Sequence, residues 1–210
     1  MAMDRQPVRL IIVDDHPTIR EGLRSAASAA GVELVAAVGD IPSAMRAATE
    51  LRADVVVCDL LFGTHPDGLR FLEWSRMLPT KLAVIVLSAY DQPSLVRRAI
   101  ELGAAGFLRK SATPTSIVGA VERAARGERT FEPAVLQVMH AAPDLPSARE
   151  LEVIRLLVKG LSNDEIGRSL GLSTKTIESH LRRLFRRYAC VGRVELVNCA
   201  QRNGWLLVSQ

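Results

Sequence analysis

The stretch VRLIIVDDHP, residues 8–17, decides the fold of the first half of the chain. It is an apolar run without polar alternation, and it stops at two carboxylates, Asp14 and Asp15, before a segment with helical spacing. A strand that is apolar on both faces is typical of a parallel sheet covered by helices on each side. We therefore expect the first strand of such a sheet at Val8–Val13.

The same strand-then-helix pattern recurs downstream. Further strands are expected at Val32–Val38, Asp54–Cys58, Leu82–Leu87 and Ala105–Leu108, and helices at Thr18–Ala30, Pro42–Leu51, Leu69–Met77, Ser94–Leu102 and Thr113–Arg126. Alternating units of this kind predict a doubly wound, five-stranded parallel sheet of the flavodoxin-like type. The strand that ends at Cys58 is expected at the centre of the sheet.

Composition excludes several classes of protein. The chain has 210 residues, 48% apolar and 24% charged, which is ordinary for a globular protein of one or two domains. The longest aliphatic run, Leu82–Leu87, is far shorter than the ~20 residues that span a membrane, and the N-terminus has no apolar core suited to a secretory signal. Three cysteines without CxxC spacing argue against a disulfide framework or a zinc site. We expect a cytoplasmic protein without membrane contact.

Charge is distributed unevenly along the chain. From Leu145 onward there are 11 Lys and Arg against 6 Asp and Glu, whereas residues 1–144 hold 16 against 17. A basic second part indicates a polyanionic partner. The Pro-containing stretch Ala141–Pro146 reads as linker, preceded by one short helix at Phe131–His140. The expected division is residues 1–127, a linker at 128–145, and an all-helical part at 146–210.

Reactive side chains follow four of the five expected strands. Because strand ends of a parallel sheet meet at one edge, these residues are expected to share a cleft: Asp14, Asp15, Asp59, Ser88 and Lys110. Clustered carboxylates need a cation, and Mg²⁺ prefers such ligands. A carboxylate can also attack phosphorus, and Asp59, on the central strand, is the expected nucleophile. Taken alone, Asp14 and Asp15 could equally be helix-capping residues.

The motifs VRLIIVDDHP, VVVCDLL, VIVLSAY and GAAGFLRKSATP resemble the receiver domain of two-component response regulators over about residues 8–127. The resemblance implies that a histidine kinase or a small phosphodonor phosphorylates Asp59. It also implies that Mg²⁺ is bound by Asp14, Asp15, Asp59 and the backbone carbonyl of Leu61. It assigns the phosphate-contacting lysine to Lys110 and the switch positions to Ser88 and Phe107.

The loop after Asp59 departs from the family pattern. It reads DLLFGTHPDG, with Phe62-Gly63 where the family has Met-Pro and one extra residue before Gly68. The change lies beyond Leu61, so the carbonyl that binds the metal is expected to be retained. The loop over the pocket can differ in shape from that of the family, and the lifetime of the phosphorylated state can differ with it. His65 lies in this loop and is expected to be solvated rather than a ligand.

The basic part contains a helix-turn-helix pattern. A short helix at Glu165–Leu170 and the turn Gly171–Ser173 precede a second helix from Thr174 to Tyr188, with one apolar stripe and a basic opposite face. We expect this second helix to enter the major groove of double-stranded DNA. The candidate DNA-contacting residues are Lys175, Thr176, Glu178, Ser179, His180, Arg182, Arg183, Arg186 and Arg187.

The strings LPSARELEVIRLLVKGLSNDEIGRSLGLSTKTIESHLRRLFRRY and GRVELV resemble the LuxR-type DNA-binding domain of NarL/FixJ-type regulators. Glu178 stands where that family commonly has lysine. A carboxylate is repelled by phosphate but can accept a hydrogen bond from cytosine N4, which indicates either a changed operator preference or weak binding unless the protein dimerises. The resemblance implies dimer contacts on DNA through the helix at Val194–Asn203, although that helix could equally do no more than cover the core.

The chain is thus interpreted as a phosphorylation-controlled, DNA-binding transcription regulator and not as an enzyme. One alternative keeps DNA binding but makes it independent of phosphorylation. Another is a phosphohydrolase with an aspartyl-phosphate intermediate. Enzymes of that type require a second Asp two residues after the nucleophile, and this chain has Leu61 at that position.

Overall fold

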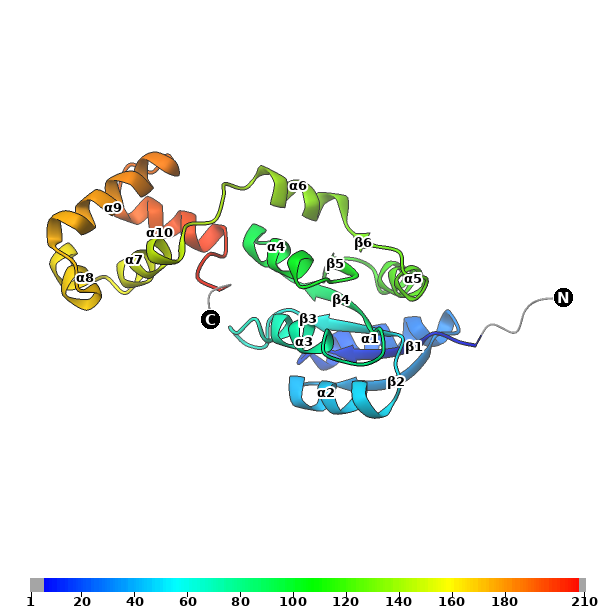
Figure 1. Cartoon of the computed structure of the whole chain (residues 1–210). Coiled ribbons are helices and arrows are strands. Elements are labelled where there is room, and N and C mark those ends of the chain that lie inside the picture. Colours follow the sequence, from blue (N-terminus) through cyan, green and yellow to red (C-terminus); the bar gives the residue numbers. More distant parts are fainter. Residues whose placement is uncertain (1–5, 208–210) are drawn as a thin grey trace. The chain divides into compact units, whose positions relative to one another are not determined.

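The apolar runs of the first half form parallel strands in the computed structural model, which describes residues 6–207. The strands are β1 (Arg9–Val13), β2 (Glu33–Val38), β3 (Val55–Asp59), β4 (Ala83–Ser88), β5 (Gly106–Arg109) and β6 (Thr130–Phe131). Within the described residues they form one sheet in the order β2-β1-β3-β4-β5-β6 (Figure 1). The prediction that Asp59 ends a central strand is confirmed, because β3 pairs with β1 on one side and β4 on the other.

The expected count of five strands is wrong by one, because β6 adds a short edge strand beside β5. Phe107 pairs with Phe131 in this added ladder, and the Thr130 amide donates to the Ala105 carbonyl at 2.8 Å. The close approach depends on Gly106, since a Cβ there would lie 2.1 Å from the Thr130 hydroxyl oxygen. A two-residue strand carries no periodicity, so the sequence pattern could not reveal it.

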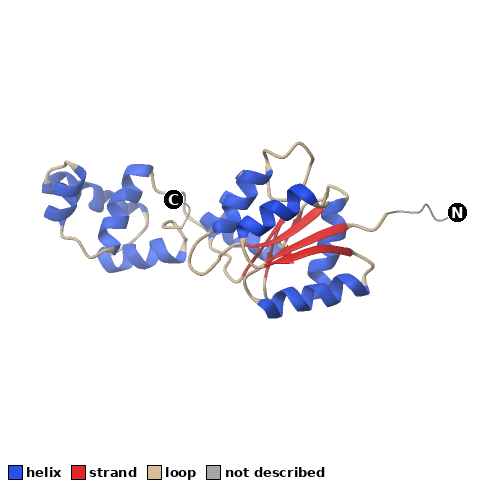
Figure 2. Cartoon of the chain, turned by 90° about the horizontal axis from the view of Figure 1, so that it is seen from below, coloured by secondary structure: helices blue, strands red, loops and turns tan. Residues whose placement is uncertain are grey.

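Helices flank this sheet on both sides (Figure 2). They are α1 (Pro17–Ala29), α2 (Ile41–Glu50), α3 (Asp67–Ser75), α4 (Pro93–Glu101) and α5 (Pro114–Ala125), each within a few residues of its expected range. α1 and α5 bury aliphatic side chains such as Leu23 and Val121 against β1, β3 and β4. The burial holds the carboxyl ends of the strands rigidly at one edge, which is where the candidate site lies.

The second half is helical, as its sequence predicts. The elements are α6 (Pro133–Ala141), α7 (Ala148–Val158), α8 (Asn163–Leu170), α9 (Thr174–Arg187) and α10 (Arg193–Arg202). Helices α7 to α10 enclose their own core around Ile154, Ile177, Leu181, Leu196 and Trp205. Most of the chain up to Val138 forms one compact unit, and the chain from Met139 onward forms another. Within residues 6–207, no helix is both long and apolar enough to cross a bilayer.

Candidate functional site

Three of the predicted strand-end residues meet at the carboxyl edge of the sheet. Asp14 follows β1, Asp59 ends β3 and Lys110 follows β5. The Lys110 ammonium donates to the Asp59 carboxylate at 2.6 Å and pairs with the Asp14 carboxylate at 2.8 Å. Both carboxylates are almost completely buried, with 1% of Asp14 and 2% of Asp59 exposed. One cation therefore bridges two buried anions.

Asp15 joins this group together with a residue that sequence reasoning missed, His16. Asp14, Asp15, His16 and Asp59 each offer one ligand atom, and these atoms lie within 4.8 Å of one another. The His16 Nδ1 atom is 2.6 Å from Asp15 and 3.1 Å from Asp14. Its position directly after the Asp pair was the available signal. His16, not either aspartate, is the N-cap residue of α1, so the capping interpretation of Asp14 and Asp15 is wrong.

The electrostatics of the pocket favour an added cation. Burial raises the pKa of Asp59 above its ordinary value and the neighbouring Asp14 charge adds to this, although the hydrogen bond from Lys110 acts in the opposite direction. Burial alone would lower the pKa of Lys110, but its hydrogen bonds to Asp14 and Asp59 outweigh burial and raise it. Lys110 is thus held as a cation, yet one positive charge faces more than one carboxylate. The carboxylates carry more negative charge than Lys110 neutralises, and oxygen ligands with such an excess suit a hard divalent cation.

The other expected pocket residues lie nearby without all touching Asp59. The Leu61 amide donates to the Asp59 carboxylate at 3.3 Å. Ser88 is buried at the end of β4, where its hydroxyl accepts from the Tyr90 amide at 3.0 Å and its carbonyl from the Lys110 amide at 2.7 Å. Phe107 is fully buried in β5, in register with Val86. The structure therefore places Ser88 and Phe107 on adjacent strands, with Ser88 hydrogen-bonded to the backbone of Lys110.

The loop with the unusual sequence forms a tight turn. The Phe62 amide donates to the His65 carbonyl at 3.0 Å, and the His65 amide donates back to the Phe62 carbonyl at 3.2 Å. This closed turn absorbs the extra residue before α3 begins at Asp67. His65 is exposed. The turn lies beyond Leu61, and Asp59 remains in the sheet ladder, in register with Leu87 on β4.

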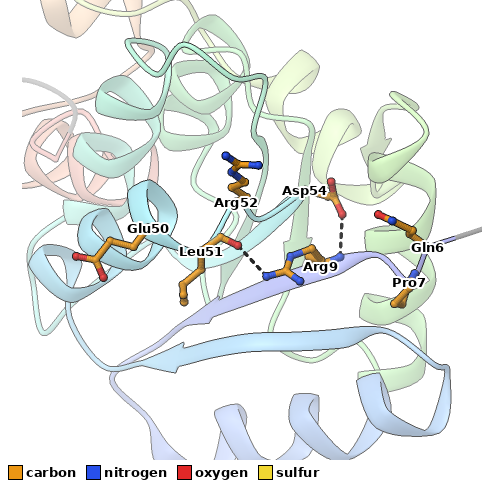
Figure 3. A pocket seen from close by; sticks show the side chains of 7 residues that line it. All are labelled: Gln6, Pro7, Arg9, Glu50, Leu51, Arg52 and Asp54. Atoms are coloured by element: carbon orange, nitrogen blue, oxygen red, sulfur yellow. Dashed lines mark hydrogen bonds between the residues drawn. The ribbon is translucent and has the colours of Figure 1, made fainter.

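A hollow of about 760 Å³ lies elsewhere on the first unit, lined by Gln6, Pro7, Arg9, Glu50, Leu51, Arg52 and Asp54 (Figure 3). Arg9 starts β1, and its backbone amide donates to Asp54, the residue just before β3, at 2.8 Å. The hollow therefore lies at the amino ends of these strands, whereas the carboxylates lie at their carboxyl ends. Ligands of open α/β sheets bind at the carboxyl ends, so the hollow is not the candidate site.

In the second unit, the local sequence sets the ends of helices α8 and α9. Ser162 and Glu165 form a reciprocal capping box at the start of α8, as predicted. Gly171 follows α8 with φ of 66°, a left-handed conformation that glycine adopts readily. Ser173 then caps α9 by accepting from the Thr176 amide. Helix, three-residue turn and helix thus follow from the caps, and the predicted helix-turn-helix arrangement is present.

Helix α9 separates its two faces completely. Ile177, Leu181 and Leu184 are buried. The opposite side exposes Lys175, Glu178, Ser179, Arg182, Arg183, Arg186 and Arg187. Thr176 and His180 are half-buried: the Thr176 hydroxyl lies 2.8 Å from the Ser173 hydroxyl, and His180 Nδ1 lies 2.9 Å from the Arg183 guanidinium. Thr176 therefore supports the start of α9 and His180 supports Arg183, and both residues border the exposed face.

Arg187 is bonded to residues outside helix α9, whereas the partner of Arg183, His180, lies on α9 itself. The Arg187 guanidinium donates to Glu150 at 3.3 Å and to the Leu145 carbonyl at 3.2 Å, and it lies 5.2 Å from the centre of the Tyr188 ring. These contacts tie the end of α9 to the start of α7. Arg187 is therefore a structural link, a role that the charge pattern did not reveal.

Helix α10 has one buried side and one open side. Leu196, Cys199 and Ala200 are buried in the core, whereas Val194 is 73% exposed and Val191, just before the helix, is 89% exposed.

Comparison with known proteins agrees with both halves of this description. The family described as "Response regulator receiver domain" matches residues 10–122, and "Bacterial regulatory proteins, luxR family" matches residues 146–200. The nitrate/nitrite response regulator protein NarP of Escherichia coli K12 is 34% identical over 198 residues, which cover 90% of this chain and 92% of NarP.

Solved structures of the regulator RcsB are similar as well. One, described as two RcsB dimers bound to two parallel DNAs, has 25% identity and a TM-score of 0.70, covering 94% of this chain and 99% of that one. Another is RcsB of Salmonella enterica serovar Typhimurium bound to promoter rprA in the presence of phosphomimetic BeF3⁻; it has 26% identity and a TM-score of 0.68, covering 93% and 98%. The chain therefore belongs to the NarL/FixJ-type response regulators of two-component systems, DNA-binding transcription regulators that join a receiver domain to a LuxR-type helix-turn-helix domain.

Proposed function

We propose that Asp59 is the phosphoacceptor through which a histidine kinase controls DNA binding by this chain. The observation that carries the proposal is the cluster of Asp14, Asp59 and Lys110 at 2.6–2.8 Å, built from three separate strand ends. The Asp59 carboxylate attacks the phosphorus of the donor, and the leaving group departs with its electron pair. Lys110 neutralises phosphoryl oxygens on the transferred group. Ser88 donates a hydrogen bond to one of those oxygens.

The metal in this pocket is proposed to be Mg²⁺, held by Asp14, Asp15, Asp59 and the Leu61 carbonyl. Three carboxylates and one backbone carbonyl match the oxygen-ligand preference of that ion. Bound there, it supplies positive charge to the phosphoryl oxygens. His16, which follows these two residues and contacts both side chains, orients the Asp14 and Asp15 carboxylates from the N-cap position of α1.

Phosphorylation is proposed to reach the DNA-binding domain through Ser88 and Phe107. A phosphoryl group on Asp59 draws the Ser88 hydroxyl away from the Tyr90 amide, and Phe107 on the adjacent strand repacks. The change alters the face formed by α4, β5 and α5. The exposed side of α9 then binds the major groove of double-stranded DNA, with Lys175, Thr176, Glu178, Ser179 and Arg182 toward the bases and His180, Arg183 and Arg186 toward phosphates.

The chain is further proposed to act as a homodimer on DNA, in the cytoplasm where DNA and the kinase's phosphodonor domain meet. The exposed valines support the dimer, because Val194 on α10 and Val191 just before it leave apolar side chains open to solvent while Leu196, Cys199 and Ala200 of the same helix are buried. The proposed domain limits are residues 1–127, a linker at 128–145 and residues 146–210. The outermost residues, 1–5 and 208–210, lie outside the described part.

Genome-wide footprinting of the wild type beside Asp59→Ala tests the central proposal. We expect the wild type to occupy specific sites and Asp59→Ala to lose most of that occupancy. Equal occupancy would favour the alternative in which DNA binding does not depend on phosphorylation, which the altered loop at Phe62–His65 motivates. Adding Glu178→Ala to the same experiment reports whether this carboxylate selects a base. The phosphohydrolase alternative does not hold, because the family consists of transcription regulators.

Alanine replacements of two neighbouring arginines should affect different properties, DNA binding for Arg186 and stability for Arg187. Arg186→Ala should weaken DNA binding and reduce the slope of log affinity against log salt by ~0.9, since one phosphate contact is lost. Arg187→Ala should lower the stability of the second unit by about 1 kcal/mol, because it breaks the contacts to Glu150 and Leu145. Salt-dependent fluorescence anisotropy and urea denaturation measure the two effects. A normal salt slope in Arg186→Ala would remove that arginine from the interface.

A further inference from the structure

The start of helix α6 is clamped to strand β5 by a single carboxylate. The Glu132 side chain accepts from the Arg109 backbone amide at 2.9 Å and from the Arg109 guanidinium Nε at 3.1 Å. Glu132 is 22% exposed at its side chain and Arg109 is 41% exposed. Two hydrogen bonds from one residue to one carboxylate fix its orientation far better than a single surface ion pair does.

Arg109 lies directly beside the proposed switch residue. In the ladder between β4 and β5, Arg109 is in register with Ser88. The next residue, Lys110, donates its amide to the Ser88 carbonyl at 2.7 Å, and its ammonium reaches Asp59. The Arg109 guanidinium also comes within 4.0 Å of Asp91, three residues after Ser88. The backbone of Ser88 is therefore directly connected to the strand that carries Arg109.

Glu132 connects this backbone to the chain that leaves the receiver domain. Its amide donates to the Phe107 carbonyl at 3.3 Å, so it continues the β5–β6 ladder by one residue. Its carbonyl accepts from the Val135 and Leu136 amides at 3.0 and 3.2 Å, which is the first turn of α6. Glu132 thus bonds to β5 through both its side chain and its amide, and to the first turn of α6 through its carbonyl.

We propose that Glu132 is a positioning residue that passes the state of the Asp59 pocket through Arg109 to helix α6. The proposal rests on phosphorylation of Asp59 and adds the route by which that event leaves the domain. Contacts of Ser88 and Lys110 set the position of Arg109, and the clamp makes the first turn of α6 follow it. Two coupled arrangements of packed elements are the physical basis of such transmission.

Hydrogen exchange read by mass spectrometry tests the route in the full chain, with and without beryllofluoride and Mg²⁺. In the wild type, peptides covering residues 59–66 and 133–141 should both change exchange rate on addition of beryllofluoride. In Glu132→Ala the first peptide should respond as before and the second should lose its response. Arg109→Ala, which keeps the backbone bond to Glu132 and the first turn of α6, should lose part of it.

The matched control is Glu128→Ala, which removes a comparable carboxylate bonded to Arg126 at 2.8 Å, away from Ser88. It should behave as wild type. DNA affinity supplies a second measure: coupling of this kind is commonly worth about 5–150-fold, and the gain with beryllofluoride should shrink several-fold in Glu132→Ala but not in Glu128→Ala. An unchanged response of residues 133–141 in both clamp variants would overturn the proposal. If beryllofluoride leaves the exchange rate of residues 59–66 unchanged in the wild type, the result would instead reject phosphorylation at Asp59.

Discussion

Replacing Asp59 with asparagine should abolish labelling of the chain by acetyl phosphate. The amide lacks the negative oxygen that attacks phosphorus, and no other carboxylate in the pocket ends the central strand. Wild-type labelling should also disappear when divalent metal is removed by EDTA and return with Mg²⁺, since the metal offsets charge on the transferred group. Phosphate-affinity gel electrophoresis and intact mass measure the product directly.

Asp67→Asn serves as the control for this experiment. Asp67 lies in the same loop region, at the start of α3, and pairs with Arg70 on the surface. Asp67→Asn should therefore be labelled by acetyl phosphate to the same extent as the wild type. Labelling of Asp59→Asn at the wild-type level would show that another residue takes the phosphoryl group, and the assignment of the pocket would then be wrong.

Replacing Lys110 with methionine should cost the first unit about 3 kcal/mol of unfolding free energy in the absence of metal. The substitution leaves Asp14 and Asp59 facing each other, both almost fully buried, without the cation that bridges them. Saturating Mg²⁺ should restore part of the loss, because the ion supplies positive charge to the same carboxylates. Urea dependence of amide exchange in β1 and β3 reads the stability of this unit alone.

The matched variant here is Lys81→Met, which removes an exposed lysine just before β4. Surface charges of this kind contribute little, so the change should stay within about 0.5 kcal/mol. Equal stability of Lys110→Met and Lys81→Met without metal would contradict the view that Lys110 holds the pocket together. Loss of the beryllofluoride response in Lys110→Met, at retained stability with Mg²⁺, would assign it a role in phosphoryl contact as well.

The strands and helices of the first unit could be predicted because each has a strong period of its own. Val55–Cys58 is apolar at every position, and all five residues of Val55–Asp59 are buried, so the composition of this run alone indicates a central strand. Helix ends followed equally from local chemistry, as with Ser162 and Glu165 at α8. Strand β6 could not be predicted, because its two residues pair only where Gly106 lets another backbone approach.

The sequence alone predicted which residue types lie at the strand ends and along α9. It placed carboxylates, a lysine and a serine after successive strands, and arginines opposite an apolar stripe. Their pairings could not be predicted, because hydrogen bonds between distant residues depend on where the backbone brings them. Tertiary structure decided that Lys110 bridges Asp14 and Asp59, that His16 joins the carboxylates, and that Arg187 binds Glu150 instead of projecting freely. It also decided that Glu132 clamps Arg109, a contact across 23 residues of chain. Local patterns specify elements because periodicity and capping act over a few residues, whereas contacts between side chains exist only after those elements have packed.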